Sequence, residues 1–205
     1  MIVTDPQGGF VLVPDLGIDA VVAYRLDPST GQLSPQPDAG GRLPPGAGPR
    51  HLAFGTGGRH AYVIAELAST LTVFAYDAAS GRLSQTQSVR TLPDEYSDAS
   101  TTAAVVVAPS GRFVYGSNRG HDSVAAFRID VVSGELSPLG QTPSGGRTPR
   151  DINIDPTGTF LLAANQNSDT VVSFRIDAST GALGPTGQSV SVPSPSRVLF
   201  VPSLA

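Results

Sequence analysis

The chain has 205 residues, of which 15% are charged, and a formal net charge of −4 at neutral pH. This acidic balance argues against a nucleic-acid partner, because phosphate binding needs a clustered basic face. Cysteine is absent, which excludes disulfides, thiolate metal sites and thiol nucleophiles.

Hydropathy and the first residues predict where the protein is found. No continuous apolar stretch reaches the length of a membrane span, and the opening MIVTDPQGGF has neither the basic region nor the apolar region of a signal peptide. We therefore expect a soluble, cytoplasmic chain with no membrane partner. Its 40% apolar content, 23 glycines and 18 prolines suit short strands joined by many turns.

Four copies of one pattern follow one another along the chain. In each copy two glycines stand 23 residues apart, and the first glycines of successive copies are separated by 50, 53 and 47 residues, the repeat length of a propeller blade. Between the glycines lie an apolar run, a polar loop and an alternating run, which predict a hairpin. The paired glycines are Gly8 and Gly31, Gly58 and Gly81, Gly111 and Gly134, and Gly158 and Gly181.

A turn motif follows each hairpin. It reads Asp-x-x-(Ser/Thr)-Gly-x-Leu and begins at Asp27 in the first copy. Asp and hydroxyl side chains cap such turns and Gly supplies a positive φ, so a third strand should follow. A further strand precedes three of the first glycines, at 51–54, 103–107 and 151–154. Four strands in meander order form the blade of an all-β β-propeller.

The number of copies predicts an incomplete ring. The final SPSRVLFVPS has the pattern of an inner strand without a hairpin after it, so we expect the chain to be the C-terminal part of a larger propeller. Apolar blade faces at the two ends of such an arc would favour self-association. The expected four-stranded antiparallel blades span about 1–46, 47–98, 99–145 and 146–193, with a closing strand over 195–202.

Polar residues gather at one end of the predicted channel. In an antiparallel blade the start of the innermost strand lies beside the end of the second strand, so residues at these two positions share one face near the axis. The first position holds Arg50, Ala103, Arg150 and Arg197, and the second holds Leu16, Glu66, Arg119 and Gln166. The residues before the second position are Asp15, Ala65, Asn118 and Asn165.

These residue types suit an anionic substrate. Arg50 and Arg119 could hold a phosphate or carboxylate and stabilise the oxyanion of a tetrahedral intermediate, and Glu66 could activate water or transfer a proton. In the alternative interpretation, Arg50 and Glu66 form a structural ion pair between adjacent strands. We take Glu66, Arg50 and Arg119 as candidate catalytic residues. The candidate substrate-binding residues are His51, Asn118, His121, Asn165, Gln166 and Arg150.

Other polar residues have competing structural explanations. His51 should alternate to the opposite face of its strand from its neighbour, so packing inside a blade competes with substrate contact. His60 takes the place of phenylalanine in the sister blades, and His121 lies in a loop where it could brace Arg119. The aspartates that recur in the hairpin loops, Asp19, Asp122 and Asp169, fit turn capping. Three scattered histidines and no close carboxylate pair form no metal-ligand set, so we expect no metal and no other cofactor.

Longer segments resemble a known family. GPRHLAF, SNRGHDS, ANQNSDT and the closing VPSPSRVLF are similar to segments of the seven-bladed lactonase family, which includes cycloisomerase-type 6-phosphogluconolactonases and the fungal carboxy-muconate lactonizing enzyme. The resemblance implies a seven-bladed ring and matches Arg50, Glu66 and Arg119 to three members of the family's proposed active-site group. It also implies a histidine at or just ahead of Met1, Asn where this chain has Ala65, and Glu where it has Ala104.

Three functions are compatible with these observations. The first is a lactonase that hydrolyses a sugar-derived lactone, 6-phosphogluconolactone to 6-phosphogluconate, with impaired activity in this chain alone; cycloisomerisation would use similar groups. The second is a non-catalytic propeller that binds a ligand or a protein partner at the same mouth. The third is a repeat protein of the surface-exposed YVTN type.

Overall fold

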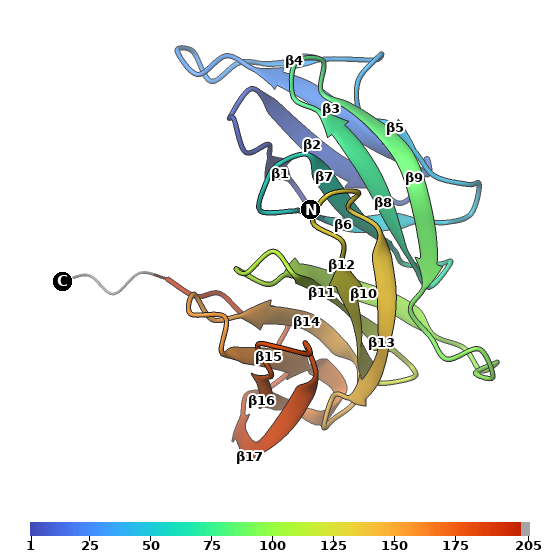
Figure 1. The fold of residues 1–205 in the computed structure, drawn as a ribbon, viewed down its shortest axis with the longest axis vertical. Coiled ribbons are helices and arrows are strands. Elements are labelled where there is room, and N and C mark those ends of the chain that lie inside the picture. Colours follow the sequence, from blue (N-terminus) through green and yellow to red (C-terminus); the bar gives the residue numbers. More distant parts are fainter. Residues whose placement is uncertain (202–205) are drawn as a thin grey trace.

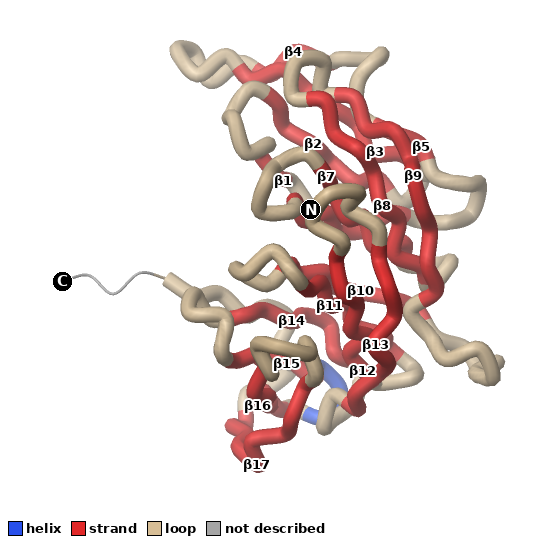
Figure 2. Tube along the Cα trace, in the orientation of Figure 1, coloured by secondary structure: helices blue, strands red, loops and turns tan. Residues whose placement is uncertain are grey.

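The computed structural model describes residues 1–201, which fold into four antiparallel sheets, one for each copy of the pattern (Figures 1 and 2). Consecutive strands pair in chain order, apart from one short strand of the first sheet, so each sheet is a meander. We number the sheets as blades 1 to 4. Each lies within the expected limits of its blade, and the all-β propeller-type fold class is confirmed.

The strands are as follows. Blade 1 contains β1 (Val3–Thr4), β2 (Phe10–Asp15), β3 (Ala20–Leu26), β4 (Leu33–Pro35) and β5 (Gly41–Arg42). Blade 2 contains β6 (Pro49–Phe54), β7 (His60–Ala65), β8 (Thr70–Asp77) and β9 (Arg82–Arg90). Blade 3 contains β10 (Thr101–Val107), β11 (Phe113–Arg119), β12 (Ser123–Ile129) and β13 (Leu136–Pro143). Blade 4 contains β14 (Pro149–Ile154), β15 (Phe160–Asn165), β16 (Thr170–Ile176) and β17 (Leu183–Ser191), with a 3-10 turn (Gln166–Ser168) after β15.

The outer strand of blade 1 is interrupted. β4 and β5 both pair with β3, at opposite ends of it, so they are two pieces of one outer strand. Pro35 and Pro37 lie at the break, and proline has no N–H to donate to a ladder. Gly40 follows with φ of +73°, and a side chain there would collide with the carbonyl of Val21. Blade 1 therefore has five short strands where four were expected.

Apolar side chains fill the space between successive blades. Alternate residues of β7 face opposite neighbours: Ala61 and Val63 join the core shared with blade 1, whereas Tyr62 and Ile64 join the core shared with blade 3. A third cluster, including Tyr115 and Phe174, joins blades 3 and 4. Burial on both faces explains why the second strands are nearly continuous apolar runs.

In the second, third and fourth copies, the glycine of the turn motif docks on the preceding blade. Gly81, Gly134 and Gly181 adopt φ of +73°, +77° and +80°, and an added Cβ would lie 2.6, 2.4 and 2.4 Å from ring atoms of Phe10, His60 and Phe113 respectively. Tyr115 also donates its hydroxyl to the carbonyl oxygen of Gly181 at 2.9 Å. The recurring glycine is thus a blade-to-blade contact as well as a turn residue. His60 is a strand residue in the place of phenylalanine, as expected.

The blades follow one another around an arc, with blades 1 and 4 at its ends (Figure 1). Residues 195–201 pass blade 4 without forming the closing strand expected over 195–202; residue 202 lies outside the described residues. The Val198 N–H donates to Asp151 Oδ2 at 2.8 Å, and Asn153 Nδ2 donates to the Val198 carbonyl oxygen at 3.0 Å. Two side chains of β14 therefore bind the backbone N–H and carbonyl of Val198, which a strand would use to pair with its neighbour. Within residues 1–201, no helix has the length and apolarity that a membrane crossing requires.

Candidate active site

The inner strands begin with bulges. The register of β6 shifts between Pro49 and His51, and that of β14 shifts between Pro149 and Asp151, so Arg50 and Arg150 have no residue opposite them in their ladders. In β10 the shift includes Ala103. A bulge bends the strand and re-aims side chains, which is common beside functional sites. Both arginines are half-buried.

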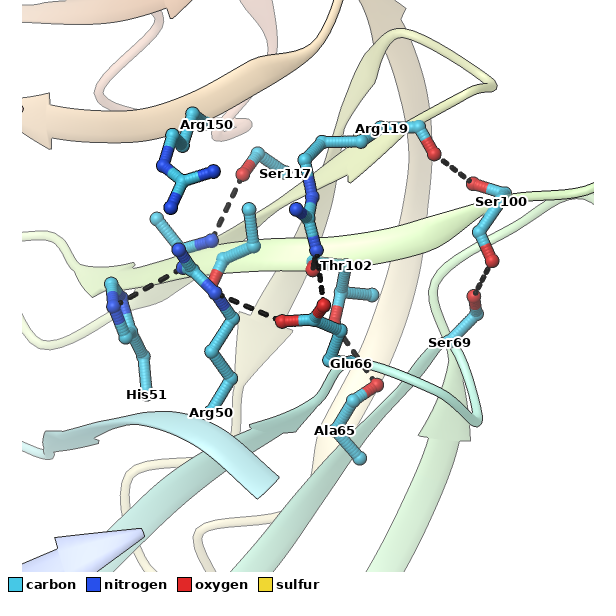
Figure 3. A network of polar contacts seen from close by, with 12 residues as sticks. Arg50, His51, Ala65, Glu66, Ser69, Ser100, Thr102, Ser117, Arg119 and Arg150 are labelled. Carbon is cyan, nitrogen blue, oxygen red and sulfur yellow. Dashed lines mark hydrogen bonds and ion pairs between the residues drawn. The ribbon is translucent and has the colours of Figure 1, made fainter. Parts of the chain in front are cut away.

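Glu66 is held between two arginines (Figure 3). It follows β7, and its N–H donates to the Gly48 carbonyl oxygen at 2.7 Å. Its Oε2 lies 3.0 Å from Arg50 Nε, and its Oε1 lies 2.8 Å from Arg119 Nη2. The three side chains are 16–20% exposed, so the cluster is partly shielded and remains open to solvent. Residues from blades 2 and 3 thus meet on one face.

The backbone of β10 holds the same two guanidinium groups. Arg50 Nη1 donates to the Ala103 carbonyl oxygen at 2.5 Å, and Arg119 Nη2 donates to that of Thr102 at 2.8 Å. Burial and the nearby Arg119 lower the pKa of Arg50, and Glu66 opposes this shift. An arginine with such neighbours still carries its charge. The mouth therefore presents fixed cations bound to one carboxylate.

Arg150 and Gln166 lie at the equivalent place in blade 4. Arg150 Nη1 donates to Gln166 Oε1 at 3.4 Å, and its guanidinium is directed toward Arg50 (Figure 3). In blade 1 the position of Glu66 is held by Leu16, which is 40% exposed. Within the described residues, blade 1 therefore adds no charged side chain to the ion pairs of Glu66.

His51 does not alternate away from Arg50, contrary to the expectation from simple strand geometry. The bulge places its Nε2 at 3.2 Å from Arg50 Nη1, and the ring lines a cavity of about 280 Å³ between the inner strands. Burial, followed by the charge of Arg50, lowers the pKa of His51 to about 3, so the ring is neutral at physiological pH. The same cavity contains Asp151, whose pKa is raised by burial and which lies 3.9 Å from Arg197 Nε. The sequence pattern gave no signal for Asp151.

Asn118 and Asn165 are buried behind the mouth and have no exposed surface. Asn118 accepts the hydroxyl of Thr91 at 2.7 Å and donates to the Thr91 carbonyl oxygen and Ser123 Oγ, both at 3.1 Å. Asn165 donates to the Ser144 carbonyl oxygen at 2.9 Å. These contacts link second strands to the ends of outer strands, so neither amide reaches a ligand at the mouth in this structure.

His121 stabilises the loop after β11. Its Nδ1 lies 2.7 Å from Ser123 Oγ, and its ring meets that of Tyr96 edge-on at 4.6 Å. Contact with Arg119 is indirect, because Ser100 Oγ donates to the Arg119 carbonyl oxygen and accepts the His121 N–H at 3.5 Å. The expected bracing therefore acts on the backbone of Arg119.

The recurrent aspartates cap turns, as expected. Asp19, Asp122 and Asp169 have φ of 52–55°. Their carboxylates accept backbone N–H groups at the start of the following segment, including Gly48 at 2.8 Å and Thr148 at 2.7 Å. Among residues 1–201, no group of three or more histidines and carboxylates is arranged to hold a metal ion.

Four meander blades with charged residues at the start of the inner strands define a β-propeller with a candidate site at the mouth of its channel. Residues 1–200 match the family described as "Lactonase, 7-bladed beta-propeller". The chain belongs to this lactonase family.

Individual relatives are longer than this chain. The 6-phosphogluconolactonase of Bacillus subtilis is 39% identical over 147 residues, which cover 71% of this chain and 41% of that protein. The structure of the periplasmic gluconolactonase PpgL of Pseudomonas aeruginosa superimposes with a TM-score of 0.92 at 38% identity, covering 98% of this chain and 56% of that one. A Lactobacillus plantarum protein gives a TM-score of 0.90 at 34% identity, over 96% and 56%. This chain thus spans about half of the relatives that it resembles.

Proposed function

We propose that the site serves hydrolysis of a sugar-derived lactone, with 6-phosphogluconolactone as substrate and 6-phosphogluconate as product. One observation supports this most directly: Glu66 lies between Arg50 and Arg119 at the channel mouth, at 3.0 and 2.8 Å. The names of the B. subtilis and P. aeruginosa relatives point to the same class of substrate.

In the proposed reaction, water attacks the lactone carbonyl carbon. Glu66 accepts a proton from that water, and the two guanidinium groups stabilise the oxyanion of the tetrahedral intermediate. Collapse of the intermediate breaks the bond between the acyl carbon and the ring oxygen, which takes up a proton and leaves as a hydroxyl. His51 is neutral beside Arg50 and can orient it as a hydrogen-bond acceptor.

The test is lactone hydrolysis by the unmodified chain and by Glu66→Gln, each corrected for spontaneous hydrolysis. Loss of a general acid or base should lower turnover about 10²-fold or more. Glu135→Gln, which changes an exposed carboxylate in the turn of blade 3, should leave turnover unchanged. Because the chain covers 41% of the B. subtilis relative, the same pair should also be measured in a form extended at the N-terminus. Equal turnover of both variants in an active protein would assign Glu66 a structural role.

The cellular compartment of the protein is also part of the proposal. The sequence predicts a cytoplasmic protein, whereas the P. aeruginosa relative is described as periplasmic. Fractionation of cells that express the natural gene would decide between the two.

A further inference from the structure

Arg150 differs from the other two arginines at the mouth. Arg50 and Arg119 each contact Glu66, whereas no carboxylate within residues 1–201 lies within 4 Å of the Arg150 guanidinium. Its side-chain contact is with the amide oxygen of Gln166, at 3.4 Å. The bulge in β14 aims it at the face that carries Glu66, as Figure 3 shows. Arg150 is therefore a half-buried cation that is available for an anionic ligand.

The residue between the two bulged arginines is small. Blade 3 has Ala103 where blades 2 and 4 have Arg50 and Arg150, and Arg50 reaches across to the Ala103 carbonyl oxygen. Ala103 is fully buried and carries no charge, so blade 3 places no fixed cation between Arg50 and Arg150 at this position.

The charges at the mouth are unbalanced. Three arginines and one glutamate leave two positive charges, and the nearby Asp151 is paired with Arg197 at 3.9 Å. A phosphate monoester carries about −1.5 to −2 charges at pH 7. A single carboxylate would neutralise only half of the excess, so the balance favours a phosphate group.

We propose that Arg150, aligned by Gln166, binds the phosphate of the substrate at a distance from the reacting ester and so selects phosphorylated over neutral lactones. This inference rests on the proposed function for its substrate. Arg50, Glu66 and Arg119 act at the carbonyl, and the planar fork of Arg150 matches two phosphate oxygens. Binding of such a remote group can be used to lower the barrier at the reacting centre.

Relative specificity tests the assignment. For Arg150→Gln, kcat/KM for 6-phosphogluconolactone should fall about 10- to 100-fold more than kcat/KM for glucono-δ-lactone, since hydrogen bonds to a charged group are lost only with the phosphorylated substrate. For Arg150→Lys, the loss of preference for the phosphorylated lactone should lie between that of Arg150→Gln and that of the unmodified chain, because lysine keeps the charge and loses the planar fork. Arg147→Gln is the matched control: Arg147 is exposed in the same loop and donates to the Asn167 carbonyl oxygen. An equal loss with both lactones, or no loss with either, would overturn the proposal.

A binding measurement separates this proposal from the lactonase hypothesis. Inorganic phosphate titrated calorimetrically into the chain should bind at least 10-fold more weakly to Arg150→Gln than to Arg147→Gln or the unmodified protein. This result would stand even if no lactone were hydrolysed. Hydrolysis of both lactones with phosphate affinity unaffected by Arg150→Gln would refute the phosphate site and leave the lactonase function intact.

Discussion

The blade-to-blade contact of the turn glycine can be measured with two equivalent substitutions, Gly181→Ala and Gly31→Ala. Both glycines close the same turn motif, with φ of +80° and +73°. A side chain in this left-handed region costs about 1–2 kcal/mol at either position. The surroundings differ, because an added Cβ meets nothing within 4 Å at Gly31 but lies 2.4 Å from Phe113 Cδ1 at Gly181.

The expected loss of stability in Gly181→Ala follows from the packing of Phe113. This ring is 1% exposed and lies in the core between blades 3 and 4, so it cannot swing away without displacing neighbours. Overpacking of this kind costs about 1–3 kcal/mol. Gly181→Ala should therefore lower the free energy of unfolding by about 1–3 kcal/mol more than Gly31→Ala. Any effect of alanine on the unfolded chain is common to both variants and cancels in the difference.

Urea unfolding of the two variants, compared at equal m-value, gives the difference. Equal losses would show that the ring of Phe113 yields to the new methyl group, and the glycine would then be required only for its backbone conformation. A larger loss for Gly31→Ala would contradict the docking interpretation outright.

Two further predictions concern buried polar groups. Asn118→Ala should lower the free energy of unfolding by roughly 1–3 kcal/mol, because Thr91 and Ser123 lose a buried hydrogen-bond partner. The loss, measured by urea unfolding, should exceed that of Asn165→Ala, because Asn165 Oδ1 already lacks a hydrogen-bond partner. His51 has a folded-state pKa of about 3 against 6.5 in the unfolded chain, so below pH 6.5 the unfolded state binds more protons and stability should fall toward pH 3. His51→Gln should reduce that pH dependence of unfolding, and an NMR titration showing His51 protonated near pH 6 would refute it.

Repetition made the fold predictable from the sequence. The glycine spacing and the turn motif each occur four times, so an error in one copy is corrected by the other three, and every expected hairpin is present. The break in the outer strand of blade 1 was missed, because it depends on two prolines and on the tight contact of Gly40 with Val21. The closing strand was predicted from the likeness of its segment to the inner strands, and that likeness does not reveal that Asp151 and Asn153 bind the backbone of Val198.

The candidate site was predictable in its residues and less so in its geometry. Strand pairing placed Arg50 beside Glu66 because the ends of paired strands must be neighbours, and Arg119 was expected there because it holds the position of Glu66 in the adjoining blade. Simple alternation failed at His51, because a bulge has no residue signature in a single sequence. Asn118 was expected to contact a ligand because its position in the sequence is next to the mouth. That position does not reveal its burial, which depends on the loop that supplies Thr91.

The structural interpretation of the Arg50–Glu66 pair can be separated from the catalytic one by combining two measurements on Glu66→Gln. If the carboxylate serves mainly to hold the arginines in place, its loss should lower the free energy of unfolding and change turnover little in the protein that remains folded, since the partners left behind are half-buried charges. If it serves as the base, the backbone carbonyls of Thr102 and Ala103 still hold the two guanidinium groups after the substitution. The net charge of the mouth then rises by one, so phosphate should bind as tightly or more tightly while turnover falls. Glutamine is nearly isosteric, which keeps steric effects out of the comparison. The two interpretations therefore differ in whether stability or turnover falls, and urea unfolding measured beside lactone hydrolysis decides between them.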